Sequence, residues 1–112
     1  MAGKKYKPIS EFVELPGWGG GCIATDRITV DGARVGYMYR EGPIDELDTG
    51  WRFLAGDEDE EYMNDTAKHG VYRVETIFNY DPGILGYLHA PEGKRFELES
   101  NGLGFRELDD DE

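Results

Sequence analysis

Five consecutive acidic residues, Asp57–Glu61, are the group in this chain whose types and spacing come nearest to chemistry. They follow a strand-like aromatic segment that ends at Gly56, and Tyr62 comes directly after them. Alternate carboxylates in such a run could bind calcium, but a calcium-binding loop needs glycine at its sixth position, where this chain has Tyr62. The free N–H groups and positive dipole end of a helix favour the same acids. The run therefore favours a solvated helix start over a metal site, and we expect neither a metal ion nor a cofactor.

Nucleophilic chemistry has few candidate residues in this sequence. Cys22 is the single cysteine, and His69 and His89 are the two histidines. A cysteine–histidine dyad needs a reactive thiol, whereas Cys22 lies in an apolar, strand-like segment where a thiol is usually inert. The glycines around Trp18 lack the following lysine and helix of a phosphate-binding loop. We therefore predict no catalytic residues, and the sequence favours a domain that is not an enzyme.

The charge balance indicates the kind of partner that the chain can bind. Its 112 residues contain 24 Asp and Glu against 12 Lys and Arg, a net charge of −12. Such an excess repels nucleic acid and anionic membranes and attracts basic proteins. A lone cysteine fits a reducing compartment, no apolar run approaches the roughly 18 residues of a spanning helix, and the basic start lacks the apolar stretch of a signal peptide. We expect a cytoplasmic protein with a basic protein partner, no nucleic acid and no membrane.

Acidic residues stand on both sides of a predicted strand, Trp51–Ala55. One short strand spans less than about 20 Å, so we expect the acids before it and after it to form one binding face. Trp51 and Tyr62 are aromatic residues of the kind that anchor interfaces. The predicted partner-binding residues are Asp45, Glu46, Asp48, Trp51, Asp57, Glu58, Asp59, Glu60, Glu61 and Tyr62.

Turn residues and alternation predict the strands. Asp31-Gly32 separates two apolar segments in the manner of a hairpin turn, and the second segment places Val35, Tyr37 and Tyr39 on one face. Asn101-Gly102 separates two further segments that can pair. The predicted strands are 22–25, 28–30 paired with 34–40, 51–55, and 94–99 paired with 105–108.

Capping residues predict the helices. Asp57 is a good N-cap with an acid three residues later, which predicts a helix over about 58–65. Apolar residues over 74–78 have helical spacing, and Asp81-Pro82 predicts the start of a third short helix. We expect Trp51 and Phe53 to pack beneath the first of these helices.

These elements predict an α+β domain: a small antiparallel sheet of about four or five strands with two or three short helices on one face. Residues 1–15 are predicted to form a partly ordered basic segment, 16–108 the single domain, and 109–112 a disordered acidic tail.

Several strings in the chain resemble a bacterial family catalogued as domain of unknown function 2185. They are Cys22–Asp26, Val35–Glu41, Asp48–Glu58, Asn79–Pro82 and Leu88–Pro91, and the resemblance covers roughly residues 21–97. That family is grouped with predicted immunity proteins of polymorphic toxin systems. The resemblance implies a protein that binds and blocks a toxin, and it implies no catalytic residues.

Two other function classes stay open from the sequence. One is a small metal-dependent hydrolase that uses Asp57, Asp59 or His89. The other is a regulatory or housekeeping domain that binds a different bacterial protein. Turnover or tight metal binding would distinguish the hydrolase from the two binding hypotheses.

Overall fold

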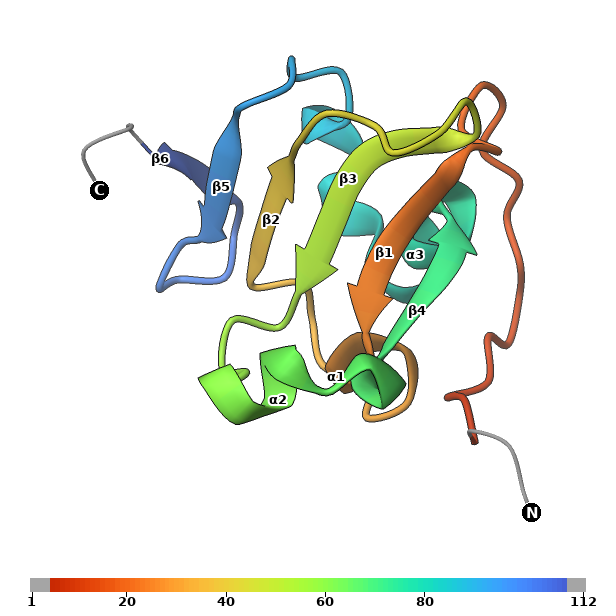
Figure 1. Cartoon of the computed structure of the whole chain (residues 1–112). Helices are drawn as coiled ribbons and strands as arrows, with labels where there is room; N and C mark the ends of the chain where they lie inside the picture. Colours follow the sequence, from red (N-terminus) through yellow and green to blue (C-terminus); the bar gives the residue numbers. More distant parts are fainter. Residues whose placement is uncertain (1–4, 109–112) are drawn as a thin grey trace.

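The computed structural model describes residues 5–108, which form one sheet and several short helices. The strands lie side by side in the order β4-β1-β3-β2-β5-β6, so β3 lies between β1 and β2 (Figure 1). This architecture confirms the predicted α+β class. The strands are β1 (Gly21–Thr25), β2 (Tyr37–Arg40), β3 (Asp48–Leu54), β4 (His69–Arg73), β5 (Arg95–Leu98) and β6 (Phe105–Leu108).

The sheet differs from the prediction in strand number and in pairing. It has six strands rather than four or five, and β1 pairs with β3 in parallel, with Ile23 opposite Arg52. The remaining pairs of the described sheet are antiparallel, including the predicted pairing of β5 with β6. The unpredicted strand is β4, which lies at an edge and exposes Val71. It therefore lacks the buried alternation by which a strand is recognised in a sequence.

The segment 28–30, predicted as a strand, begins instead within helix α1 (Asp26–Thr29). The Val30 N–H donates to the Asp26 carbonyl, and Ile28 is fully buried in the core. A short apolar run fits a helical turn as well as a strand, so periodicity does not separate the two. Gly32, at φ +79°, therefore reverses the chain after a helix rather than between hairpin strands.

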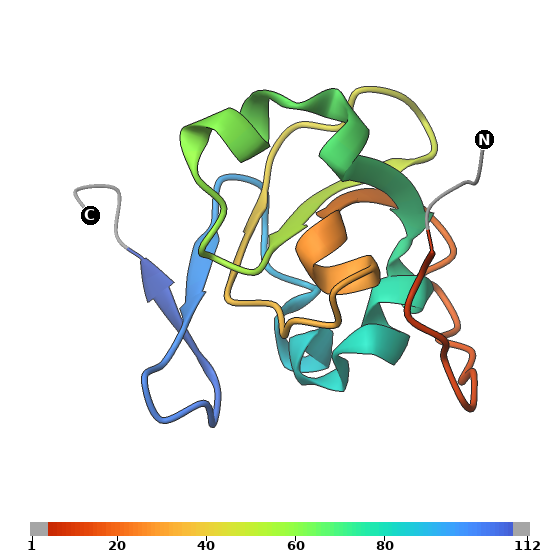
Figure 2. The ribbon, with the colours of Figure 1, turned by 90° about the horizontal axis from the view of Figure 1, so that it is seen from below.

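The helices form two groups on opposite sides of the sheet (Figure 2), so the prediction that they pack on one face is wrong. α1, α3 (Val74–Tyr80) and the 3₁₀ helix η2 (Pro82–Tyr87) cover one face, whereas α2 (Glu60–Asn64) and the 3₁₀ helix η1 (Thr66–Lys68) lie on the other side (Figure 2). α3 confirms the predicted second helix. The predicted cap Asp81 accepts the Gly83 N–H at 3.0 Å, although the helix that follows is 3₁₀. α2 is shorter than the predicted 58–65, and Asp59 caps it rather than Asp57.

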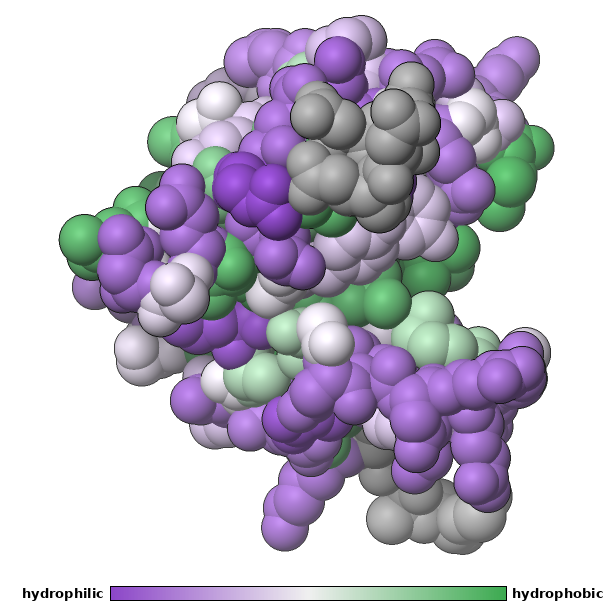
Figure 3. Space-filling view, turned by 90° about the vertical axis from the view of Figure 1, so that its left-hand side faces the viewer, coloured by the Kyte–Doolittle hydropathy of each residue, from purple (hydrophilic) through white to green (hydrophobic). Residues whose placement is uncertain are grey.

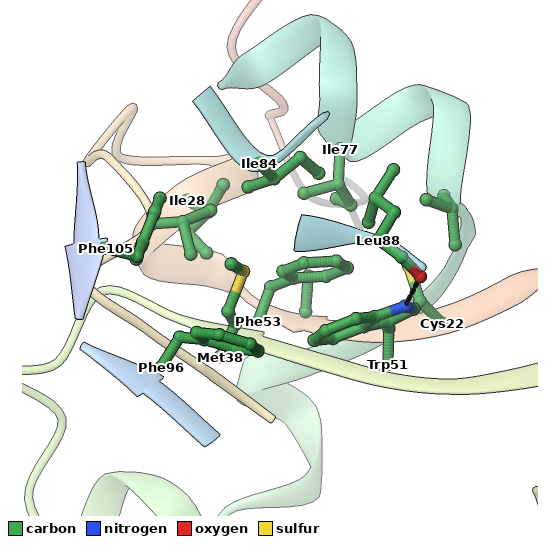
Figure 4. Packing of buried hydrophobic residues seen from close by; sticks show 13 residues of the cluster. Cys22, Ile28, Met38, Trp51, Phe53, Ile77, Ile84, Leu88, Phe96 and Phe105 are labelled. Atoms are coloured by element: carbon green, nitrogen blue, oxygen red, sulfur yellow. Dashed lines mark hydrogen bonds between the residues drawn. The ribbon is translucent and has the colours of Figure 1, made fainter. Parts of the chain in front are cut away.

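The hydrophobic core lies between the sheet and the group of α1, α3 and η2 (Figure 4). Trp51 and Phe53 stack with ring centroids 5.8 Å apart, and the Trp51 indole N–H donates to the Leu88 carbonyl at 3.1 Å. They were predicted to lie beneath the helix after Gly56, but alternate residues of β3 face α3 and η2, not α2. Val35 is also in this core, ahead of β2, so it does not share the face of Tyr37 and Tyr39.

The described part of the N-terminal segment, residues 5–15, runs along α1 and α3. The Lys7 N–H donates to the Thr29 carbonyl, and Asn79 exchanges two hydrogen bonds with the Val13 backbone. The predicted acidic tail, 109–112, lies outside the described residues. Within residues 5–108, no helix combines the length and the apolar character needed to cross a membrane.

Candidate protein-binding site

The predicted acidic contact residues lie at the two ends of the open face of the sheet, which is the face turned away from α3. Side chains alternate along a strand, so Arg52 and Leu54 of β3 lie on this face. Tyr39 pairs with Arg52 and Tyr37 with Leu54 across the neighbouring strand, which places both tyrosines on the same face. The two half-buried tyrosine rings are 5.7 Å apart. The middle of the open face is therefore aromatic and aliphatic around one arginine.

Arg52 forms a buried, bidentate ion pair with Asp48. Its Nη1 and Nη2 atoms donate to the two Asp48 carboxylate oxygens at 2.9 and 2.8 Å, and its Nε donates to Glu41 at 2.6 Å. The side chains of Arg52 and Asp48 are only 4% and 8% exposed. The Arg52 guanidinium, helped by N–H donors from Gly50 and Ile44, holds the pKa of Asp48 well below its ordinary value of 3.8. Asp48 is thus a structural carboxylate rather than a free contact.

Two hollows open on this side of the sheet and share Leu54 in their walls. The larger, about 640 Å³, is lined by Tyr37, Leu54, the residues after β3 and Glu97 of β5. Two basic residues, Arg27 of α1 and Arg34 ahead of β2, also line it. The smaller, about 200 Å³, is lined by Tyr39, Arg52 and Met63 among others. Seen from the β6 edge, the surface is hollowed above a hydrophilic lower part, and apolar atoms show in the hollow (Figure 3). The open face is therefore concave.

The loop before β3, residues 41–47, forms one end of this face. The Asp45 carboxylate accepts the N–H groups of Leu47 and Asp48, each at 2.9 Å, and the Asp48 carboxylate accepts the Ile44 N–H at 2.9 Å. These bonds fold the loop on itself and use both carboxylates. Glu46 is exposed, and within residues 5–108 its carboxylate has no hydrogen bond or ion pair. Of the three acids predicted here, Glu46 alone is free to contact a partner.

Glu58, after β3, is held by three donors. Its carboxylate accepts the Ala55 and Gly56 N–H groups, both at 2.8 Å, and the Thr25 hydroxyl at 2.6 Å. Successive backbone N–H groups of this kind form an anion-binding concavity. Gly56 adopts φ +100°, a left-handed conformation that favours glycine, and this lets the chain turn so that Glu58 reaches back. Glu58 therefore closes the turn after β3.

Of the other acids in the Asp57–Glu61 run, two are bound to groups of the chain and two are free. Asp57 pairs with Arg27 through two bonds of 3.0 and 2.7 Å, and this arginine lowers the pKa of Asp57. Asp59 caps α2 by accepting the Tyr62 N–H at 2.8 Å. The carboxylates of Glu60 and Glu61 are exposed and, within residues 5–108, make no hydrogen bond or ion pair. The half-buried Tyr62 ring lies 5.9 Å from the Lys68 ammonium.

The two groups of predicted acids lie at opposite ends of β3 (Figure 1). A strand of seven residues is about 20 Å long, so the acids flank the open face and do not form one continuous patch. Trp51 is fully buried on the core side and is not available at the surface. The structure therefore keeps Glu46, Glu60, Glu61 and Tyr62 as accessible members of the predicted contact set.

Residues 22–108 match the family model described as the Immunity protein Imm33 domain. The chain belongs to the Imm33 immunity-protein family. The match confirms the immunity-protein grouping that the sequence strings predicted, while the number 2185 is not part of it. No curated protein and no solved structure matches the chain.

Cys22 and the two histidines of this Imm33 domain each have surroundings of their own. Burial raises the pKa of the Cys22 thiol to about 12, so the thiol stays protonated at neutral pH. His89 packs against Trp18, with ring centroids 5.3 Å apart, whereas His69 contacts the Met63 carbonyl. Within residues 5–108, no three His, Cys, Asp or Glu side chains are grouped so that they could hold a metal ion.

The contact residues predicted from the sequence of this Imm33 domain do not include the apolar members of the site. Ile44 and Leu47 in the loop before β3 are 74% and 79% exposed, and both flank predicted acids. A signal for them existed: two lone aliphatic residues in an acidic loop after Pro43 cannot belong to a strand core. Tyr37 and Tyr39 were assigned to one face correctly, but only the pairing with β3 identifies that face as the open one.

Proposed function

We propose that the chain binds a protein toxin and blocks it without chemistry of its own. The observation that carries this proposal is the Imm33 immunity-domain match over residues 22–108. Further support comes from the candidate site, where side chains are arranged for contact rather than for a reaction. In the bacterial cytoplasm, such a protein would protect the cell that makes it.

The charge of the chain supports a basic toxin surface as the partner. The net charge is −12, and the accessible carboxylates Glu46, Glu60 and Glu61 flank the concave open face. Charge of one sign around a concave surface raises the rate of encounter with a partner of opposite charge. The same charge opposes binding to nucleic acid and to anionic membranes. Salt-sensitive, micromolar binding of mixed oligonucleotides would contradict this part of the proposal.

The experiment that tests the function is affinity capture from the cells that encode the chain. Mass spectrometry identifies the captured protein, which is then expressed alone and together with the chain in a test bacterium. We expect a basic protein that stops growth alone and is harmless in the presence of the chain. Failure to capture any protein in stoichiometric amount, or a captured toxin that remains active with its partner bound, would contradict the proposal.

A further inference from the structure

The loop between β2 and β3 exposes the two aliphatic side chains Ile44 and Leu47. We call this pair the loop knob. Leu103 at the β5–β6 turn and Val71 on β4 are similarly exposed, at 88% and 76%, but each belongs to a different element. Exposed apolar surface that is gathered in one place and rimmed by polar residues marks protein interaction sites, whereas singly scattered apolar residues do not.

The backbone of the knob is held in place before any partner arrives. The Asp45 carboxylate binds the Leu47 N–H, and the Asp48 carboxylate binds the Ile44 N–H. Asp48 is itself fixed by the buried Arg52. At the end of the loop, the Gly50 carbonyl accepts the Glu41 N–H at 3.0 Å, and Gly50 adopts φ +89°. A rigid loop loses little conformational entropy on binding, which favours affinity.

Carboxylates surround the loop knob. Glu41, Asp45 and Glu46 belong to the same loop and are exposed, although Glu41 pairs with Arg52 and the Asp45 carboxylate accepts N–H groups of the loop, which leaves Glu46 as the free one. Glu92 reaches the loop from another segment, since its Oε1 lies 3.6 Å from the position that a Cβ would take on Gly42. The neighbouring Arg40 does not offset them, because its guanidinium turns inward and donates to the Thr49 and Ala90 carbonyls at 2.9 Å. The knob is therefore apolar at its centre and strongly negative around it.

We infer that the loop knob is the docking element of the chain, and that its occupant is a protein surface with an apolar pocket rimmed by Lys and Arg. This inference rests on the proposed function and names the surface through which it acts. Ile44 and Leu47 fill the pocket, while the surrounding carboxylates meet the basic rim. A second copy of the chain does not fit, because two knobs would bring like charges together.

Site-specific photo-cross-linking in the encoding cells tests the inference. Benzoylphenylalanine replaces Ile44 or Leu47 in two variants, and Val71 or Leu103 in two matched controls of similar exposure. Adducts from positions 44 and 47 to one basic protein, absent from the controls, are expected. Adducts only from the control positions, or between two copies of the chain, would overturn the docking role of the loop knob and leave the proposed function standing. No adduct at any position would overturn both.

Affinity measurements complete the test. The partner identified by cross-linking is purified, and its Kd for the chain and for each variant is measured. Each of Ile44→Ala and Leu47→Ala is expected to raise Kd roughly 10-fold, because each truncation removes apolar surface that the partner's pocket would bury. Val71→Ala and Leu103→Ala are expected to leave Kd within about twofold. The four sites are solvent-exposed, so all variants remain folded, as circular dichroism would verify. An unchanged Kd in the Ile44→Ala/Leu47→Ala double variant would overturn the inference.

Discussion

The two ends of β3 carry similar densities of acidic residues and use them differently. Before the strand, two carboxylates fold a loop that presents Ile44 and Leu47 to solvent. After the strand, three of five carboxylates bind inward: Asp57 to Arg27, Glu58 to a backbone turn, and Asp59 to the start of α2. Negative charge in a sequence therefore indicates electrostatic attraction, but not which carboxylates remain available for it.

The largest expected difference between the two ends concerns Asp48. Asp48→Ala leaves the buried Arg52 guanidinium with Glu41 alone, and such unpaired buried charges cost about 3–5 kcal/mol of stability. Glu46→Ala, in the same loop but exposed, is the matched control and should change stability by less than about 0.5 kcal/mol. Urea melts measure both. A loss below about 1 kcal/mol for Asp48→Ala would mean that the ion pair does not hold this end together.

The same ion pair predicts a dependence of stability on pH. The pKa of Asp48 is lowered in the folded state from its ordinary value of 3.8, so the folded protein binds fewer protons at this carboxyl than the unfolded chain. The contribution of Asp48 is therefore fully present above about pH 4 and declines as the pH falls further. We expect wild-type stability to drop more steeply between neutral pH and pH 2 than that of Asp48→Asn. Parallel profiles for the two proteins would contradict this.

The end after β3 depends on Glu58. Glu58→Ala removes an acceptor for two backbone N–H groups and the Thr25 hydroxyl, and we expect a loss of about 1–3 kcal/mol. Glu60→Ala, two residues later and exposed, should cost less than about 0.5 kcal/mol. Thermal melts compare the two variants. Equal effects would show that Glu58 is a surface charge like its neighbour.

The smallest effect is expected from the free carboxylates. Neutralising Glu46 at one end, or Glu60 and Glu61 at the other, should slow association with the captured toxin several-fold at low salt and leave it unchanged at high salt. Stopped-flow or surface-binding measurements of the two variants show which end of β3 contributes more to the association rate. If the Glu46→Gln variant alone is slower, steering is centred on the loop knob. Equal on-rates in all proteins at low salt would leave these acids with a role in solubility alone.

Local signals predicted the local parts of the fold. The β5–β6 hairpin across Asn101-Gly102, the apolar spacing of α3 and the Asp81 cap all depend on residues close in the chain. The missed features are non-local or lack a pattern. β4 is an exposed edge strand, and α1 is one turn long, so neither has a periodicity to recognise.

Charge predicted where the candidate site lies, but not which acids are bound within the chain, because their partners are distant in the sequence. Asp57 pairs with Arg27, and Glu58 binds Thr25, each about thirty residues away in the chain. No spacing rule connects residues at that separation before the sheet is assembled. Trp51 was predicted as both core and contact candidate, and only the register of β3 decides between the two.

The parallel pairing of β1 and β3 has a consequence for how the chain acquires its structure. Gly21 lies opposite Asp48 on one side and opposite Arg73 on the other, so both neighbours of the first strand come from much later in the chain. During synthesis, β1 stays unpaired until β3 has left the ribosome, and its other edge stays open until β4 follows. Long-range pairing of this kind slows folding relative to local hairpins. Until β3 arrives, β1 (Gly21–Thr25) has two open edges, and we expect this interval to be the period in which the chain is most prone to aggregate.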